Sequence, residues 1–229
     1  MTSEGKSPTE KWVEEKGADY AYAYDKGEKL FRALGGTGLP HAALIDPSGT
    51  VVWKGHPAGL TAKTIEEHLD GTLETPVFEW PDSAKNVRKA LQKEQYASAI
   101  DVAEKLGDEG AEIASQLRRM VAARLAGLRK LYAEGDYLGV EVMGERCARA
   151  FAKLPEGEEA EALLKQLSSD EEAQRILDVQ KDIDRTISGR IKKKDRERIL
   201  EDLREITREY AGTAAARDAE RAMAALRKA

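Results

Sequence analysis

The sequence predicts an α+β chain in which a small mixed domain, residues 1–74, precedes an all-α domain, residues 83–229. Composition changes near residue 75: ten of the 19 glycines and four of the seven prolines lie ahead of it, with short strand-like runs between them. After it, apolar residues recur at helical spacings. Residues 75–82 contain two prolines that stop a helix from running through. This segment is the predicted connector, and Phe78 and Trp80 are expected to pack it against a neighbouring domain.

Short elements follow one another in the first domain. Residues 8–16 predict a helix, with Ser7 as its N-cap because a proline follows at the first helical position. Residues 18–25 (ADYAYAYD) alternate small and aromatic side chains, which is the period-two pattern of a strand. Residues 27–34 predict a second short helix, because two glycines end it.

A β-hairpin is the clearest local prediction. The apolar run HAALID (41–46) and its partner TVVWKG (50–55) are joined by Asp-Pro-Ser-Gly, a sequence typical of a type I turn. A closing helix is expected after Thr61 or Thr64, either of which could cap it. The spacing of Ile65 and Leu69 predicts that both face inward.

The second domain is predicted to be a helical-hairpin array. Polar breaks recur between successive helices (KEQY, EGDY and KKKD), and short runs rich in small residues are expected as turns (GDEGA, PEGEE and GTAAA). The helices are expected from Ser83, across Ile100, from about Ala111, across Val140, from Asp170, across Ile199 and from Thr213. Such helical pairs resemble tetratricopeptide-like units, which bury their apolar faces only by stacking.

Residues 2–73 also resemble the C-terminal portion of a TlpA/ResA-like, redoxin-type thioredoxin-fold protein. The resemblance rests on the order of pieces: a short strand ending at Asp25, the loop Gly38-Leu39-Pro40, a strand ending LID, a turn PSG and a strand VVWKG. It implies a partial thioredoxin-like fold and a cis bond between Leu39 and Pro40. It further implies that these two residues line a substrate-binding groove for an extended peptide.

The chain departs from that family in one decisive respect. Family members exchange thiols and disulfides through a W-C-x-x-C motif, whereas this sequence has a single cysteine and none of the CxxC half of the domain. Either the chain is a truncated paralogue, or Met1 lies inside a longer reading frame; the second is favoured because a selected protein would rarely discard the middle of its own sheet. The complete protein would then be a thiol–disulfide oxidoreductase. This chain is expected to be inactive, with no catalytic residue. The alternative function is a non-catalytic helical-repeat scaffold that binds a protein or peptide partner.

Several other function classes are not expected. Cys147 lies on an apolar helical stripe and predicts an ordinary buried thiol. His41, His56 and His68 match no metal-ligand spacing, and the basic run 190–198 predicts a solvated break between helices. We therefore expect no metal and no cofactor. The net charge of -5 is spread over both signs, so no nucleic-acid partner is expected, and no apolar run reaches the length of a membrane span.

Two further expectations concern stability and compartment. Three short strands bury too little surface for an independent core, so residues 1–74 alone are predicted to be poorly folded. Their unpaired strand edges make self-association possible. The family works mostly outside the cytoplasm, which implies an export signal ahead of Met1. Residues 1–12 themselves lack the apolar core of a signal peptide, so the compartment stays open.

Overall fold

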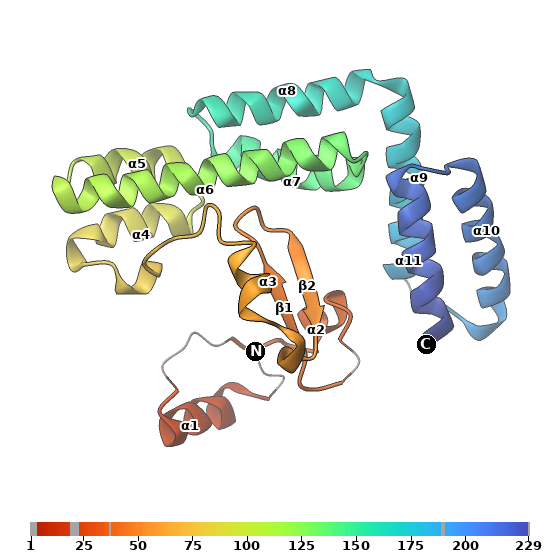
Figure 1. Ribbon diagram of the computed structural model, residues 1–229, viewed down its shortest axis with the longest axis horizontal. Helices are drawn as coiled ribbons and strands as arrows, with labels where there is room; N and C mark the ends of the chain where they lie inside the picture. The colour runs from red at the N-terminus through yellow and green to blue at the C-terminus, as the bar shows by residue number, and fades with distance from the viewer. Residues whose placement is uncertain (1–3, 19–22, 37, 189–190, 229) are drawn as a thin grey trace. The chain divides into compact units, whose positions relative to one another are not determined.

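The computed structural model describes residues 4–18, 23–36, 38–188 and 191–228 (Figure 1). The chain is α+β and divides into two compact units. The first, Met1–Leu69, is called here the N-terminal unit, and the second, Asp70–Ala229, the helical unit.

The N-terminal unit combines a two-stranded antiparallel sheet with short helices. Its elements are α1 (Lys6–Lys16), α2 (Lys29–Ala33), β1 (Ala42–Ile45), β2 (Val51–Gly55), the 3-10 turn η1 (Pro57–Gly59) and α3 (Ala62–Glu66). The strands pair with Leu44 opposite Trp53, and an irregularity after Leu44 shifts Ile45 opposite Val51. The predicted hairpin is therefore confirmed.

The hairpin turn is stabilised by the side chain of Asp46. Its Oδ1 accepts the backbone N–H of Thr50 at 2.9 Å, and its backbone carbonyl accepts the N–H of Gly49, also at 2.9 Å. Gly49 has φ 92°, a left-handed conformation that a side chain disfavours. Aspartate and glycine are thus required at the two ends of this turn.

The start of α1, the strand expected before α2 and the cap of α3 can each be compared with the prediction. The first helix begins at Lys6 after Gly5, so the expectation of a Ser7 cap is wrong; Thr9 instead donates its hydroxyl to the carbonyl of Gly5 at 3.0 Å. Half of the strand expected at residues 18–25, residues 19–22, falls outside the described residues, and Tyr24 makes a single β-bridge. Thr61 caps α3, where it accepts the N–H of Thr64 at 3.1 Å.

Ile65 and Leu69 were expected to face inward, and this is also wrong. Ile65 is 37% exposed and Leu69 is 48% exposed. The reason lies in the whole unit, because none of its described apolar side chains is buried. A helix can present an apolar face by its spacing, but the face stays exposed where nothing packs on it.

The helical unit contains eight α-helices among its described residues. They are α4 (Lys85–Gln92), α5 (Tyr96–Glu104), α6 (Asp108–Ala133), α7 (Tyr137–Ala150), α8 (Pro155–Ser169), α9 (Glu171–Ser188), α10 (Arg196–Glu209) and α11 (Ala214–Lys228). Short 3-10 turns lie at Val77–Glu79, Asp82–Ala84 and Lys193–Asp195. The predicted caps of α9 and α11 are present, since Asp170 accepts the N–H of Ala173 and Thr213 that of Ala216.

The helical unit differs from the prediction in two respects. The runs GDEGA, PEGEE and GTAAA, expected as turns, instead lie mostly in the first turns of α6, α8 and α11. In PEGEE this is because Pro155 at the first helical position favours a helix there. The break KKKD was expected to join a hairpin of α9 and α10. In the structure α10 packs against α11, and α11 packs against α9.

Two helical hairpins, α4–α5 and α6–α7, share the same turn geometry. Residues Glu94 and Gly135 both have a left-handed backbone, with φ 56° and 70°. In each turn the next residue donates its N–H to the carbonyl five positions back, Gln95 to Ala90 and Asp136 to Leu131, both at 3.0 Å. This is the Schellman pattern that ends a helix. The breaks KEQY and EGDY are therefore structurally equivalent.

The segment before α4 belongs to the helical unit. Trp80 is 5% exposed and lies in the same apolar cluster as Val87, and its indole N–H donates to the carbonyl of Thr75 at 3.1 Å. The packing expected for Trp80 is confirmed. The prediction that Phe78 packs against a neighbouring domain is wrong, since Phe78 is 67% exposed.

Helix α9 contributes to two separate apolar clusters. Ala173 and Leu177 lie in a cluster with Phe151, whereas Ile183, further along the helix, lies in a cluster with Leu203. One continuous helix thus connects the core formed by α6 to α8 with the core formed by α10 and α11 (Figure 1).

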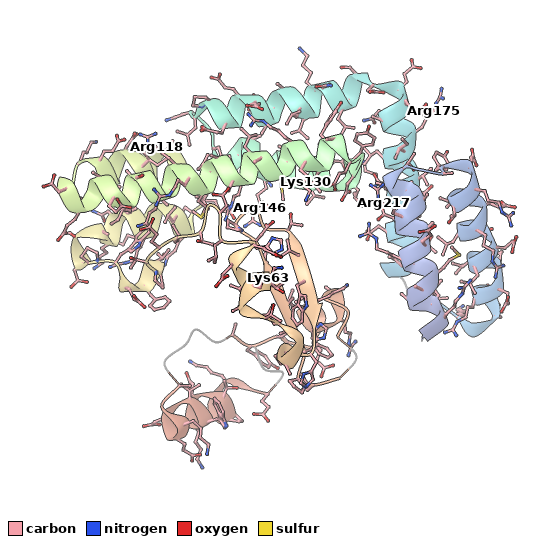
Figure 2. The ribbon with its side chains drawn as sticks, viewed as in Figure 1. Lys63, Arg118, Lys130, Arg146, Arg175 and Arg217 are labelled. Atoms are coloured by element: carbon pink, nitrogen blue, oxygen red, sulfur yellow. The ribbon has the colours of Figure 1, made fainter. Side chains whose placement is uncertain are left out.

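A buried glutamine joins α7, α9 and α11. Gln180 is 1% exposed; its Oε1 accepts the N–H groups of Tyr137 (3.0 Å) and Leu138 (3.2 Å), and its Nε2 donates to Asp218 at 2.8 Å. Nearby on α11, Arg217 (labelled in Figure 2) donates to the carbonyl of Glu134 at 2.7 Å. The beginning of α11 is thereby fixed to the α6–α7 turn.

Candidate functional site

The N-terminal unit contains a pocket of about 510 Å³ between its loops, α2 and β1. The residues that line it are mostly apolar or acidic: Glu4, Asp25, Glu28, Leu30, Phe31, Leu34, Leu39, His41, Ala42, Ala43 and Ile45. They come from segments that are separate in the sequence, and the turn ahead of α2 and the loop ahead of β1 bring them together.

Leu39, one of the two predicted substrate-binding residues, lies at this pocket. Its side chain is 82% exposed, and the peptide bond to Pro40 is cis, as expected. In the part of the chain that the structure describes, no hydrogen bond reaches the backbone N–H or C=O of Leu39. Neither group therefore has a hydrogen-bond partner among the described residues. Pro40 follows directly and leads into β1 but does not line the pocket.

One wall of the pocket is formed by an aromatic pair. Phe31 and His41 meet edge to face, with 5.8 Å between their ring centroids. Nε2 of His41 lies 3.3 Å from the carbonyl oxygen of Leu34. Because a carbonyl can only accept, Nε2 carries the hydrogen in this contact. These contacts connect the residue ahead of β1 with α2 and with the residue that follows it.

Asp25 organises the turn that leads into α2. Its two carboxylate oxygens accept the backbone N–H groups of Leu30 (3.1 Å) and Phe31 (2.9 Å). The hydrogen bond from Phe31 and then that from Leu30 hold the pKa of Asp25 below its ordinary value. The carboxylate is therefore negatively charged at neutral pH, and it lies at the pocket.

Glu28 is the other acidic residue of this turn. It has a left-handed backbone, with φ 57°, and it precedes α2. Its carboxylate pairs with Arg32 of α2 at 3.3 Å, and both side chains are largely exposed. An exposed pair of this kind is weak, so Glu28 can exchange its partner at little cost.

The other residues weighed from the sequence lie elsewhere. Cys147 is on α7 in the helical unit, 3% exposed within an apolar cluster, and burial raises the pKa of its thiol. His56 accepts the N–H of Ala58 at its Nδ1 and so caps η1. Within the described ranges, no group of three or more His, Cys, Asp or Glu residues is arranged to hold a metal ion. Nor does any helix in those ranges combine the length and apolar character that crossing a membrane requires.

The acidic lining of the pocket was not predicted from the sequence. Asp25 was identified only as the end of a short strand, and Glu28 was not singled out. A signal was present, because an aspartate a few residues ahead of a helix often accepts its first N–H groups. The sequence does not reveal that the loop carrying Leu39 returns to the same place.

Comparison with protein-family models, with curated proteins and with solved structures found no match for this chain.

Proposed function

We propose that the N-terminal unit binds an extended peptide across Leu39 and Pro40, as the substrate-binding half of a TlpA-like thioredoxin-fold thiol–disulfide oxidoreductase. The observation that carries this proposal is that Leu39, an exposed residue at a largely apolar pocket, has no hydrogen-bond partner for its backbone N–H or C=O among the described residues. Backbone N–H and C=O groups that lack partners are the groups to which an extended peptide adds as a further strand.

The proposed binding mode uses two kinds of contact. The peptide backbone would exchange hydrogen bonds with the N–H and C=O of Leu39, which supplies affinity with little sequence preference. A side chain of the peptide would enter the pocket and contact Leu30 and Ile45, which are 42% and 53% exposed in the free chain. Burial of such apolar surface is favourable by about 25 cal/mol per Å².

We assign thiol–disulfide exchange to a complete TlpA-like protein, which carries both cysteines, and not to this chain. That reaction requires a thiolate that attacks the substrate disulfide and a second thiol that resolves the mixed disulfide. The sequence supplies one cysteine, Cys147, and it is buried in the helical unit. We therefore propose that this chain binds a peptide without catalysing thiol–disulfide exchange.

A binding assay with matched variants of the full chain tests the proposal. A fluorescein-labelled peptide of alternating valine and leucine, solubilised by a short polyethylene glycol tail, is titrated while its anisotropy is recorded. Leu39→Asp should weaken binding by at least about tenfold, because a charge replaces apolar contact beside the groove. Ile65→Asp, on α3 and outside the pocket, is the control and should leave the affinity unchanged. Equal effects of the two substitutions would contradict the proposed site.

The scaffold function expected for the helical array has no comparable support. Among the described residues of the helical unit, the large apolar side chains that are exposed are Phe78, Val142 and Ile187, on three separate segments. They do not form a continuous row along the stacked helices. That function stays a prediction.

A further inference from the structure

The charged residues that line the pocket are of one sign. Among the described residues, its lining includes the carboxylates of Glu4, Asp25 and Glu28 and no lysine or arginine. Of the other lining residues that the structure describes, only His41 has a side chain that can carry charge. Arg32 pairs with Glu28 from α2 but lies outside the lining, so it offsets part of the negative charge and occupies none of the pocket.

Asp25 keeps its negative charge at neutral pH, because backbone hydrogen bonds lower the pKa of its carboxyl group. The groups that donate hydrogen bonds to it, chiefly those of Phe31 and Leu30, are backbone N–H groups, which are neutral and do not cancel the charge of the carboxylate. A ligand cation at the pocket would therefore meet an oriented, charged acceptor that needs no rearrangement.

Exposed apolar side chains line the pocket together with these carboxylates. Within the described ranges, eight of the eleven large apolar side chains that are exposed belong to the N-terminal unit, and Leu30, Leu39 and Ile45 of these line the pocket. No described apolar side chain of the unit is buried. An occupant that matches this surface must bring both apolar surface and positive charge.

We propose that the peptide bound at Leu39 carries an apolar residue flanked by lysine or arginine. The apolar side chain covers Leu30, Leu39 and Ile45, and the flanking cation pairs with Asp25 and Glu28. This inference rests on the proposed peptide-binding function and adds the chemical class of the peptide. A polypeptide is favoured over a small cation because the backbone groups of Leu39 are also available for pairing.

Two labelled peptides of equal length test the charge preference on the full chain. One is acetyl-Lys-Val-Leu-Val-Lys-amide, and the other replaces both lysines by glutamate. At pH 7.5 and low ionic strength, the lysine peptide should bind about tenfold or more tightly than the glutamate peptide, because electrostatic complementarity favours the first and repels the second. Raising the salt concentration should reduce this difference, since the groups are solvent-exposed.

A matched pair of variants locates the effect. Glu28→Gln should weaken binding of the lysine peptide about two- to fivefold, as expected for loss of one exposed charge pair. Glu66→Gln removes an exposed carboxylate of α3 in the same unit but outside the pocket, and it should have no effect. Circular dichroism of each variant establishes that the fold is retained.

The outcomes separate this inference from the proposed function. Equal affinities for the two peptides, with binding still lost in Leu39→Asp, would overturn the charge preference and leave the peptide groove in place. Equal effects of Glu28→Gln and Glu66→Gln would also overturn it. Failure of both peptides to bind would overturn the groove and the preference together.

Discussion

Cys147 illustrates how surroundings determine the chemistry of one side chain. It lies among the buried residues around Phe151, and desolvation raises the pKa of its thiol. Arg124 and Arg146 oppose this shift, because positive charge favours the thiolate, but burial is the larger effect. The thiol is therefore neutral at physiological pH, and a neutral thiol is a poor nucleophile.

We predict that Cys147 does not react with Ellman's reagent in the folded chain at pH 8. After unfolding in guanidinium chloride, one thiol per chain should be released to the reagent, in agreement with the single cysteine of the sequence. The absorbance at the end of each reaction measures both. Rapid reaction of the folded chain would show that the α7 region opens readily, contrary to its burial.

Of the two residues proposed from the sequence to bind substrate, the structure places Leu39 in the pocket lining and leaves Pro40 outside it. Leu39 and Pro40 were singled out from the order of sequence motifs around them, and their role in binding stays a proposal. Asp25 and Glu28 could not be singled out in this way, because their place at the pocket depends on the loop before β1. The burial expected for Ile65 also failed, since spacing defines a face and only packing decides whether it is covered.

At the scale of elements, two glycines set how closely neighbouring helices approach. Gly110 is the third residue of α6, and Gly157 is the third residue of α8. A Cβ added at Gly110 would lie 1.8 Å from the carbonyl oxygen of Ala103, and one at Gly157 would lie 2.4 Å from that of Phe151. At both junctions, α5–α6 and α7–α8, a glycine in the first turn of the second helix thus allows close contact with the end of the first.

We predict that Gly157→Ala destabilises the helical unit, although alanine is the better helix former. The added methyl group meets a backbone oxygen that cannot move aside, and such overpacking costs about 1–3 kcal/mol. Urea unfolding followed at 222 nm measures the change. Gly144→Ala is the control, because its Cβ meets the flexible end of Leu164, at 2.8 Å, and the cost should be smaller. A stabilising effect of Gly157→Ala would contradict the close approach.

The same glycine explains why one element escaped prediction. In the sequence, Pro155 and Gly157 stand close together and indicate a turn. The structure uses proline to begin a helix and glycine to let that helix pack, and so α8 forms. The hairpin and α4 to α7 could be predicted because their apolar spacing and turn residues agree. The partner of α10 could not, because spacing does not specify which helix covers an apolar face.

At the scale of the whole chain, the two units differ in how their apolar residues are buried. The helical unit has three apolar clusters, whereas the described part of the N-terminal unit has no buried apolar side chain. Because burial of apolar surface is the main favourable contribution to folding, the N-terminal unit should be much less stable.

We therefore predict that hydrogen exchange differs sharply between the units. Peptides from residues 42–55 should exchange at the shortest labelling times, and those from residues 113–128 should stay protected far longer, because their amides open only with the core. Mass spectrometry of the intact chain after labelling and digestion measures both. Comparable protection of the hairpin and of α6 would mean that the N-terminal unit has a stable core of its own.

The continuity of α9 has a consequence for cooperativity. Unfolding of the Ile183 end of α9 would expose the apolar cluster around Leu203 to solvent. Unfolding of the Ala173 end would likewise expose the cluster around Phe151. Neither apolar cluster can therefore unfold alone without destabilising the other, because both contain residues of α9. The array from α6 to α11 should accordingly lose its structure in one concerted step and not helix by helix, despite its repetitive appearance.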